Sequence, residues 1–105
     1  MKEISVFALD QRIKANESVN VIDVREASEL EIVKMDGAQH IPMGDIPLRM
    51  NELDKDSELI IMCKSGGRSA QVCDFLERNG YSNVTNLSGG IISWAQNIDK
   101  NLNTY

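Results

Sequence analysis

Cysteine and histidine are scarce in this 105-residue sequence, which has two cysteines and one histidine. The spacing of Cys63 and Cys73 fits neither the framework of a disulfide-rich domain nor a paired metal-ligand motif. A zinc site with a single histidine would have to rely on carboxylate ligands. We therefore expect no metal centre, and no motif in the sequence indicates a cofactor.

Positive charge is also in short supply, with 11 Lys and Arg residues against 16 Asp and Glu residues and a formal net charge of −5. This balance argues against nucleic-acid binding, which needs a basic face. No segment approaches the ~18 apolar residues of a membrane span. Lys2 and Glu3 place charge where a signal peptide needs apolar residues. We expect a cytoplasmic protein that binds neither nucleic acid nor membrane.

The length suits one domain, residues 1–105, and the hydrophobic fraction of 42% is ordinary for a globular chain. Strand-like and helix-like segments alternate along it. Strands are expected at residues 19–24, 38–41, 59–62 and 84–87, and helices at 6–13, 25–33, 44–53 and 70–79, with a last helix holding Ile91, Ile92 and Trp94. This alternation predicts an α/β fold, with a mostly parallel central sheet flanked by helices on both faces.

The most informative stretch is Cys63–Ser69, which follows the unbroken apolar run 59–62. A cysteine is thus expected at the carboxyl end of a buried strand, where α/β sheets bind their ligands. Gly66 and Gly67 allow the backbone to close tightly, so that successive amides form an anion-binding nest. Lys64 and Arg68, with no acid between them, and the start of the following helix add positive charge. We predict that the Cys63 thiol ionises readily beside an anion pocket.

These residues suggest a nucleophilic cysteine, Cys63, with a donor-binding loop around it. The loop residues expected to hold an anionic substrate are Lys64, Ser65, Gly66, Gly67, Arg68 and Ser69. Each has a plainer reading: Cys63 could simply pack, Lys64 and Arg68 could be surface charges, and Ser69 could cap the helix. The catalytic interpretation requires that solvent reach the Cys63 side chain and that the surrounding amides point at it.

Five further residues have mainly structural interpretations. Cys73 lies at helical spacing from neighbouring apolar residues and is expected in the core, with a resolving thiol for Cys63 as the alternative. Asp23 and Arg25, after the second predicted strand, are expected to form a charged pair that braces the Cys63 loop. His40 is expected to be a loop residue without a catalytic role, and Trp94 a core residue.

Four motifs appear in a characteristic order along the chain: Ile22–Glu26, Gly37–Pro42, Cys63–Ser69 and Leu87–Ile91. Together they resemble a single-domain rhodanese, although Lys34-Met35-Asp36 stands where many members have His-x-Pro. The segment 94–105 is also similar to rhodanese domains fused to adenylyltransferases that activate ubiquitin-like sulfur carriers.

The resemblance implies a rhodanese-like fold and a sulfurtransferase. By this resemblance Cys63 accepts sulfane sulfur from thiosulfate or another small anionic donor, such as a persulfide. It then holds the sulfur as a persulfide and passes it to a thiophilic acceptor. That acceptor could be cyanide, a thiol or a protein in a sulfur relay, for instance one that serves cofactor or tRNA thiolation.

Two other functions remain open. Phosphatases and arsenate reductases of related fold also use a Cys-to-Arg loop, but theirs resembles Cys-x5-Arg, whereas Cys63 and Arg68 are separated by four residues. A shorter ring of amides should suit a sulfur-loaded cysteine better than a phosphate ester. The other possibility is a binding module or passive sulfur carrier that works mainly by docking a partner protein.

Overall fold

Five strands form one sheet in the order β1-β5-β4-β2-β3 in the computed structural model, which describes residues 1–105. The strands are β1 (Lys2–Ile4), β2 (Val21–Asp23), β3 (Gln39–His40), β4 (Leu59–Met62) and β5 (Val84–Leu87). Every neighbouring pair is parallel. All four residues of the central strand β4 are buried, as its unbroken apolar run predicts.

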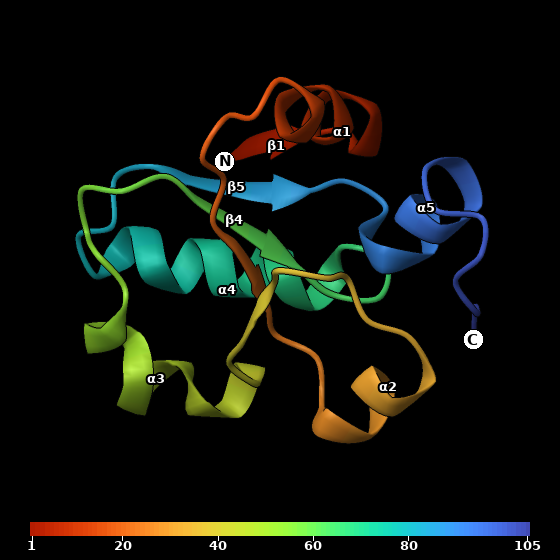
Figure 1. Ribbon diagram of the computed structural model, residues 1–105. Helices are drawn as coiled ribbons and strands as arrows, with labels where there is room; N and C mark the ends of the chain where they lie inside the picture. The colour runs from red at the N-terminus through yellow and green to blue at the C-terminus, as the bar shows by residue number, and fades with distance from the viewer.

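Five α-helices surround the sheet (Figure 1): α1 (Val6–Lys14), α2 (Ala27–Ile32), α3 (Ile46–Arg49), α4 (Gly67–Arg78) and α5 (Gly90–Asn97). The expected helix at 44–53 is wrong as one element, because it consists of α3 between two 3₁₀ turns, Met43–Asp45 and Met50–Glu52. Pro47 lies in the first turn of α3. Proline has no amide to donate and its ring blocks the preceding turn, so a regular helix cannot run through it.

The strand β1 is absent from the sequence-based prediction. It pairs only with β5, with Lys2 opposite Thr85 and Ile4 opposite Leu87. Its three residues show no alternation of polar and apolar side chains. This segment is therefore a strand because its backbone pairs with β5, and its side-chain pattern alone would not indicate a strand.

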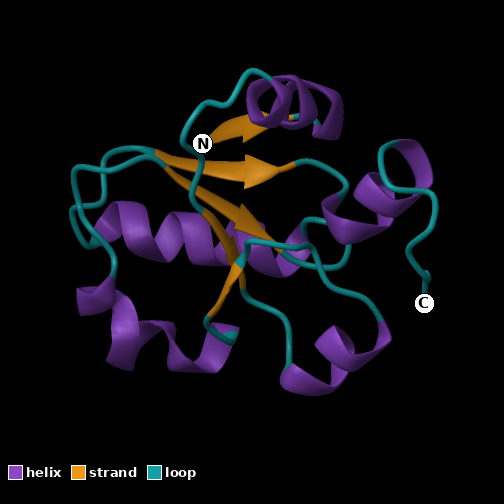
Figure 2. Ribbon diagram, viewed as in Figure 1, coloured by secondary structure: helices purple, strands orange, loops and turns teal.

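The two faces of the sheet carry separate apolar clusters, and Figure 2 shows helices on both sides of the strands. Leu59 and Ile61 of β4 pack with residues of α3 and α4, whereas Ile60 and Met62 pack with residues of α1 and α5. Successive strand residues point to opposite faces, which explains this division. The structure thus has the α/β architecture that the sequence predicts.

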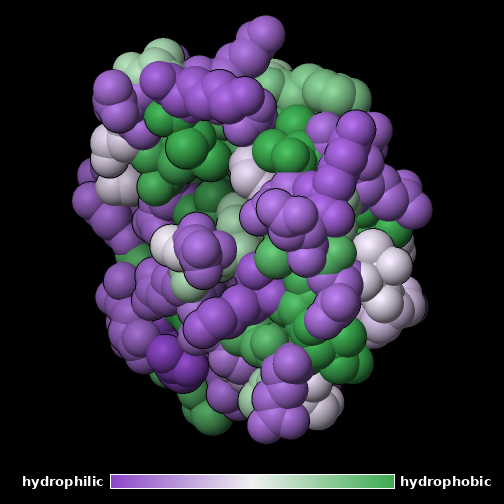
Figure 3. Space-filling model, turned by 45° about the vertical axis from the view of Figure 1, so that its right-hand side comes forward, coloured by the Kyte–Doolittle hydropathy of each residue, from purple (hydrophilic) through white to green (hydrophobic).

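The carboxyl ends of β4 and β5 point toward the side of the molecule where α2, α5 and residue 105 lie (Figure 1). Cys63 follows β4 directly, and Asp23 is the last residue of β2. Figure 3 brings this side forward and shows polar and apolar side chains intermixed on its surface. No helix is both long enough and apolar enough to cross a membrane.

Candidate active site

The Cys63 sulfur lies inside the turn that connects β4 to α4. The amide of Gly66 donates a hydrogen bond to Cys63 Sγ over 3.1 Å, and the Ser69 hydroxyl lies 3.3 Å from the same sulfur. Gly66 has a φ of +114°, a conformation that residues with a Cβ rarely adopt. Glycine at this position thus turns the backbone so that its amide faces the thiol, as the interpretation of the loop requires.

Hydrogen bonding lowers the pKa of the Cys63 thiol below its ordinary value. Burial is the largest single influence and on its own would raise the pKa, because it disfavours the thiolate. The Ser69 hydroxyl and the amides of Ser69, Gly66 and Ser65 oppose burial and together outweigh it. The expected ionisation therefore rests on the donors of the loop, which are fixed in place around the sulfur.

Solvent access to Cys63 differs from the sequence-based expectation. The residue is only 1% exposed and belongs to the apolar cluster that α3 and α4 form on the sheet. The loop closes tightly enough to surround the thiol with donors, and the same closure excludes water. Any donor molecule must therefore enter through a displacement of the groups that cover the sulfur.

Helix α4 begins at Gly67, three residues before the expected start, so that Arg68 and Ser69 belong to its first turn. Gly67 does not have a positive φ, and a Cβ added there would meet nothing within 4 Å. The expectation that both glycines shape the turn is wrong for Gly67, because helical backbone accepts any residue with a Cβ at this open position. Ser65 is exposed beside it.

Asn86, near the end of β5, holds the loop from the side, and sequence analysis does not single it out. Its side-chain amide donates to the Gly66 carbonyl over 3.2 Å, and its oxygen lies 2.5 Å from the oxygen of the Ser69 hydroxyl, whose one proton is shared between Asn86 and the Cys63 sulfur. Asn86 and Ser69 are both buried. Asparagine is depleted in strands and costly to bury, so an asparagine within a predicted buried strand is the signal that could have identified it.

Gly90, at the start of α5, also lies against the loop. The amides of Ile91 and Ile92, at the start of α5, donate to the carbonyls of Cys63 and Lys64 over 2.9 and 3.1 Å. A Cβ on Gly90 would lie 2.4 Å from the Lys64 carbonyl oxygen and 2.5 Å from that of Cys63. Glycine is therefore necessary at position 90 because α5 approaches the backbone of the Cys63 loop closely, and not only because the chain turns there.

Arg68 is engaged by an acidic residue from another part of the chain. Its guanidinium binds both carboxylate oxygens of Glu29, in α2, over 2.6 and 2.9 Å. The Arg68 hydrogen bonds hold the pKa of Glu29 at about 2, well below its ordinary value. Glu29 is thus ionised at neutral pH and compensates the positive charge of Arg68, which the sequence-based interpretation expects to be available for an anionic substrate.

The predicted pair of Asp23 and Arg25 is present and completely buried. The Arg25 Nη2 atom lies 2.8 Å from Asp23 Oδ2, and the same nitrogen donates to the Val33 carbonyl over 2.8 Å. The pair contacts α2 and the residue that follows it, and forms no hydrogen bond with the Cys63 loop itself. The expected direct brace on the loop is therefore wrong; the pair instead holds α2, whose Glu29 binds Arg68.

Tyr105 completes this group of charged residues. Its hydroxyl accepts from Arg25 Nη1 over 2.9 Å and donates to Glu29 Oε2 over 2.5 Å. The Lys64 ammonium nitrogen lies 4.5 Å from the centre of its ring. Residues 98–105 thus pack onto the domain at the candidate site through Tyr105, which sequence analysis does not assign to it.

Cys73 and Trp94 take the core positions that the sequence predicts, whereas His40, expected in a loop, lies in strand β3. Cys73 is fully buried, and burial raises the pKa of its thiol to about 12, which makes it a poor nucleophile or resolving thiol. Trp94 is buried in the cluster of α1 and α5. His40 ends β3, and its Nε2 atom lies 2.7 Å from the Arg25 carbonyl oxygen.

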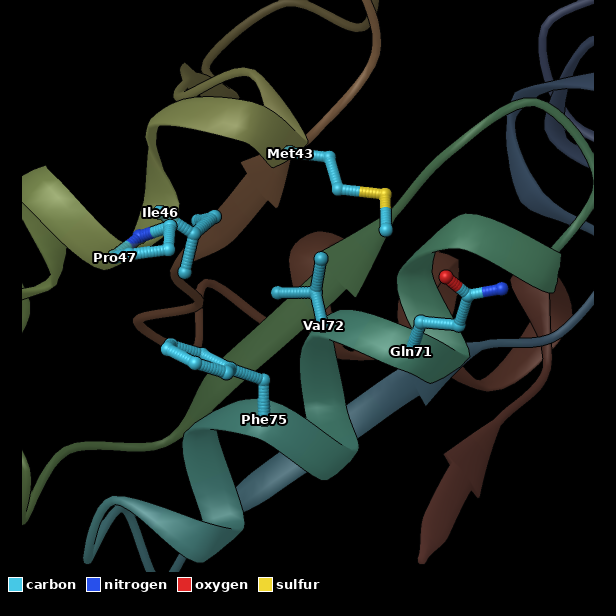
Figure 4. A pocket seen from close by; sticks show the side chains of 6 residues that line it. All are labelled: Met43, Ile46, Pro47, Gln71, Val72 and Phe75. Carbon is cyan, nitrogen blue, oxygen red and sulfur yellow. The ribbon is translucent and has the colours of Figure 1, made fainter.

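An apolar hollow of about 280 Å³ lies between the segment that contains α3 and helix α4 (Figure 4). Its lining residues are Met43, Ile46, Pro47, Gln71, Val72 and Phe75. None of them belongs to the predicted site, and the polar groups that surround Cys63 are absent from its walls. The hollow is therefore distinct from the Cys63 loop.

A thiol surrounded by amide donors at the carboxyl edge of a parallel sheet defines a class of cysteine-dependent α/β proteins. Within that class, residues 6–97 match the family model described as a rhodanese-like domain. The chain therefore belongs to the rhodanese family.

Individual relatives agree with this assignment. The chain is 46% identical over 94 residues to "Putative sulfurtransferase YtwF" of Bacillus subtilis, covering 90% of each protein. The crystal structure of a rhodanese-like domain protein from Staphylococcus aureus superposes with a TM-score of 0.86 at 32% identity, covering 100% of this chain and 99% of the other.

The fused proteins that the sequence resembles are also among the relatives. The chain is 36% identical over 87 residues to "Probable adenylyltransferase/sulfurtransferase MoeZ" of Mycobacterium tuberculosis, covering 81% of this chain and 22% of that protein. Relatives named as sulfurtransferases support a transferase role for this chain.

Proposed function

We propose that the protein transfers sulfane sulfur from thiosulfate or a persulfide donor to a thiophilic acceptor through a persulfide on Cys63. The observation that carries this proposal is the Cys63 sulfur itself, which accepts a hydrogen bond from Gly66 and contacts Ser69 inside the turn. Donors that stabilise a thiolate also stabilise the negative terminal sulfur of a persulfide. The family membership supports the same chemistry.

The reaction has two steps. In the first, the Cys63 thiolate attacks the outer sulfur of thiosulfate. A new S–S bond forms on Cys63, and the donor S–S bond breaks with its electron pair leaving on sulfite. In the second step, an acceptor such as cyanide attacks the terminal sulfur of the persulfide, producing thiocyanate and regenerating the thiolate. Neither step requires a general base once Cys63 is ionised.

The geometry favours this reaction over phosphate-ester hydrolysis. In the Cys-to-Arg loops of phosphatases of related fold, five residues separate the cysteine from the arginine, and the arginine is free to bind the phosphate. Arg68 instead binds Glu29 through both carboxylate oxygens, and four residues separate it from Cys63. We expect the protein to turn over thiosulfate with cyanide and to leave an aryl phosphate intact, as measured on the same preparation.

A loading experiment tests the proposal. The protein is incubated with thiosulfate, alkylated and digested, and mass spectrometry then locates the added sulfur atom. We expect it on the peptide that contains Cys63, and none on that peptide after Cys63→Ser. Cys73→Ala is the matched control, because it removes the other thiol and should leave the loading of Cys63 unchanged.

The same samples test access to the buried thiol. Because Cys63 is 1% exposed and Cys73 is fully buried, alkylation of the folded protein by iodoacetamide distinguishes a loop that opens from one that does not. We expect selective alkylation of Cys63. A Cys63 thiol that resists alkylation until the protein unfolds would overturn the proposal.

A further inference from the structure

Three cationic side chains meet beside the Cys63 loop, and two of them have carboxylate partners. Arg25 pairs with Asp23, and Arg68 pairs with Glu29. Lys64 forms no ion pair, so it is the one uncompensated cation of this group. A small dianion that binds at the loop would therefore depend on the Lys64 ammonium for its charge partner.

The ring of Tyr105 binds the Lys64 ammonium. The Lys64 Nζ atom lies 4.5 Å from the centre of the Tyr105 ring, within the range of a cation–π interaction. The ring is itself fixed, because its hydroxyl binds Arg25 and Glu29 at the same time. Lys64 must leave this ring before it can contact a molecule at the sulfur.

Resting on the proposed sulfur transfer, we propose that Tyr105 determines donor specificity: by holding Lys64 it disfavours thiosulfate and favours a low-molecular-weight alkyl persulfide. Thiosulfate carries two charges and has a dianionic leaving group, sulfite. An alkyl persulfide carries at most one charge, which the amides around Cys63 Sγ can accept without a side-chain cation.

The preferred step balances without a further reactant. The Cys63 thiolate attacks the outer sulfur of the alkyl persulfide R–S–SH and forms the Cys63 persulfide, Cys63–S–SH. The donor S–S bond breaks, and its electron pair leaves on the thiolate R–S⁻. This leaving group has a single negative charge, so the step does not depend on Lys64.

The test measures single-turnover loading of Cys63 by mass spectrometry over a range of donor concentrations, with thiosulfate and with 2-hydroxyethyl persulfide, whose alkyl group is neutral. In Tyr105→Leu we expect the half-saturating thiosulfate concentration to fall about 3- to 10-fold, the size of a lost cation–π contact, and that of 2-hydroxyethyl persulfide to change less than about twofold. Tyr105→Phe keeps the ring but loses the hydroxyl that fixes it, so its half-saturating thiosulfate concentration should lie between those of the wild type and Tyr105→Leu.

Two further variants show whether Tyr105 acts through Lys64. In the Lys64→Met background, Tyr105→Leu should give no gain with thiosulfate, because the cation that the ring holds is absent. Lys55→Met is the matched control: Lys55 lies 5.6 Å from the Tyr81 ring and precedes β4, at the opposite end of the strand from Cys63. It removes the same charge and should leave both donors unaffected.

Several results would overturn this role of Tyr105. They are an equal change for both donors in Tyr105→Leu, the same gain in Tyr105→Phe, or a gain that persists without Lys64. Failure of the proposed sulfur transfer gives a different result, since neither donor would then load Cys63 in the wild-type protein. The two proposals are thus tested separately in one experiment.

Discussion

Replacement of Gly90 by alanine tests how closely α5 must approach the Cys63 loop. The added Cβ would lie 2.4 Å from the Lys64 carbonyl oxygen and 2.5 Å from the Cys63 carbonyl oxygen. Both contacts are with backbone atoms, which cannot move aside as a flexible side chain can. The φ of Gly90, +58°, adds the strain of a left-handed conformation.

The magnitude follows from these two effects. A left-handed conformation costs an L-residue about 1–2 kcal/mol, and overpacking typically costs about 1–3 kcal/mol. Their sum, about 2–5 kcal/mol, is a large share of the ~5–15 kcal/mol that stabilise a typical domain. For a domain of this size we expect the melting temperature to fall by about 10 °C or more.

Circular dichroism melting of Gly90→Ala and Gly67→Ala provides the measurement and its control. A Cβ on Gly67 meets no atom within 4 Å, so Gly67→Ala should retain or raise the melting temperature. Gly90→Ala should also load sulfur on Cys63 more slowly at temperatures where it stays folded, because the displaced carbonyls belong to Cys63 and Lys64. Equal melting temperatures for the two variants would refute the inferred close packing of α5 on the loop.

Two predictions concern the buried charges. The pKa of Glu29, held at about 2, lies below its unfolded value of 4.5, so the stabilisation by Glu29 is complete above pH 4.5 and is lost as the pH falls toward 2. Because Arg68 is 35% exposed, we expect its ion pair with Glu29 to contribute only about 1 kcal/mol to the free energy of unfolding. In urea titrations the difference in stability between the wild type and Glu29→Gln should shrink as the pH falls from 4.5 toward 2. A difference that stays constant over this range would contradict the explanation. Arg25→Met leaves the buried Asp23 without its charge partner and should lower the free energy of unfolding by about 3–5 kcal/mol in the same assay. The double variant Asp23→Leu/Arg25→Met should be more stable than Arg25→Met, and a less stable double variant would contradict the explanation.

The sequence predicts elements best where local pattern and tertiary environment agree. Strands β4 and β5 match their predicted residues, since both are buried apolar or β-branched runs between turn residues. The helix expected at 6–13 is α1, and the Ser5 hydroxyl caps its start by accepting from the Ala8 amide. Strand β1 was unpredictable for the opposite reason, because only its partner β5 makes it a strand.

The candidate site could be predicted only where its residues are neighbours in sequence. The Cys63 loop and the Asp23–Arg25 pair are local motifs, and the structure brings each together. Glu29, Asn86 and Tyr105 reach the loop from other segments, so no spacing in the sequence indicates them. The sequence therefore predicts an uncompensated positive charge on Arg68, which is wrong because the acid that compensates it, Glu29, comes from α2.

The contacts around Cys63 indicate that backbone amides, more than charged side chains, stabilise the groups that react in sulfur transfer. A lowered pKa enlarges the thiolate fraction of Cys63, but intrinsic nucleophilicity falls at the same time with a Brønsted slope of about 0.4–0.5, so the net gain is modest. Arg68 is compensated by Glu29, and Lys64 is held by Tyr105.

Stabilisation of the leaving group then falls to the loop amides, which are effective only when they are fixed before the reaction. Asn86 fixes them through the Gly66 carbonyl, and α5 fixes them through the carbonyls of Cys63 and Lys64. Residues that never touch a donor molecule should therefore control the rate of sulfur transfer as strongly as the charged residues of the loop.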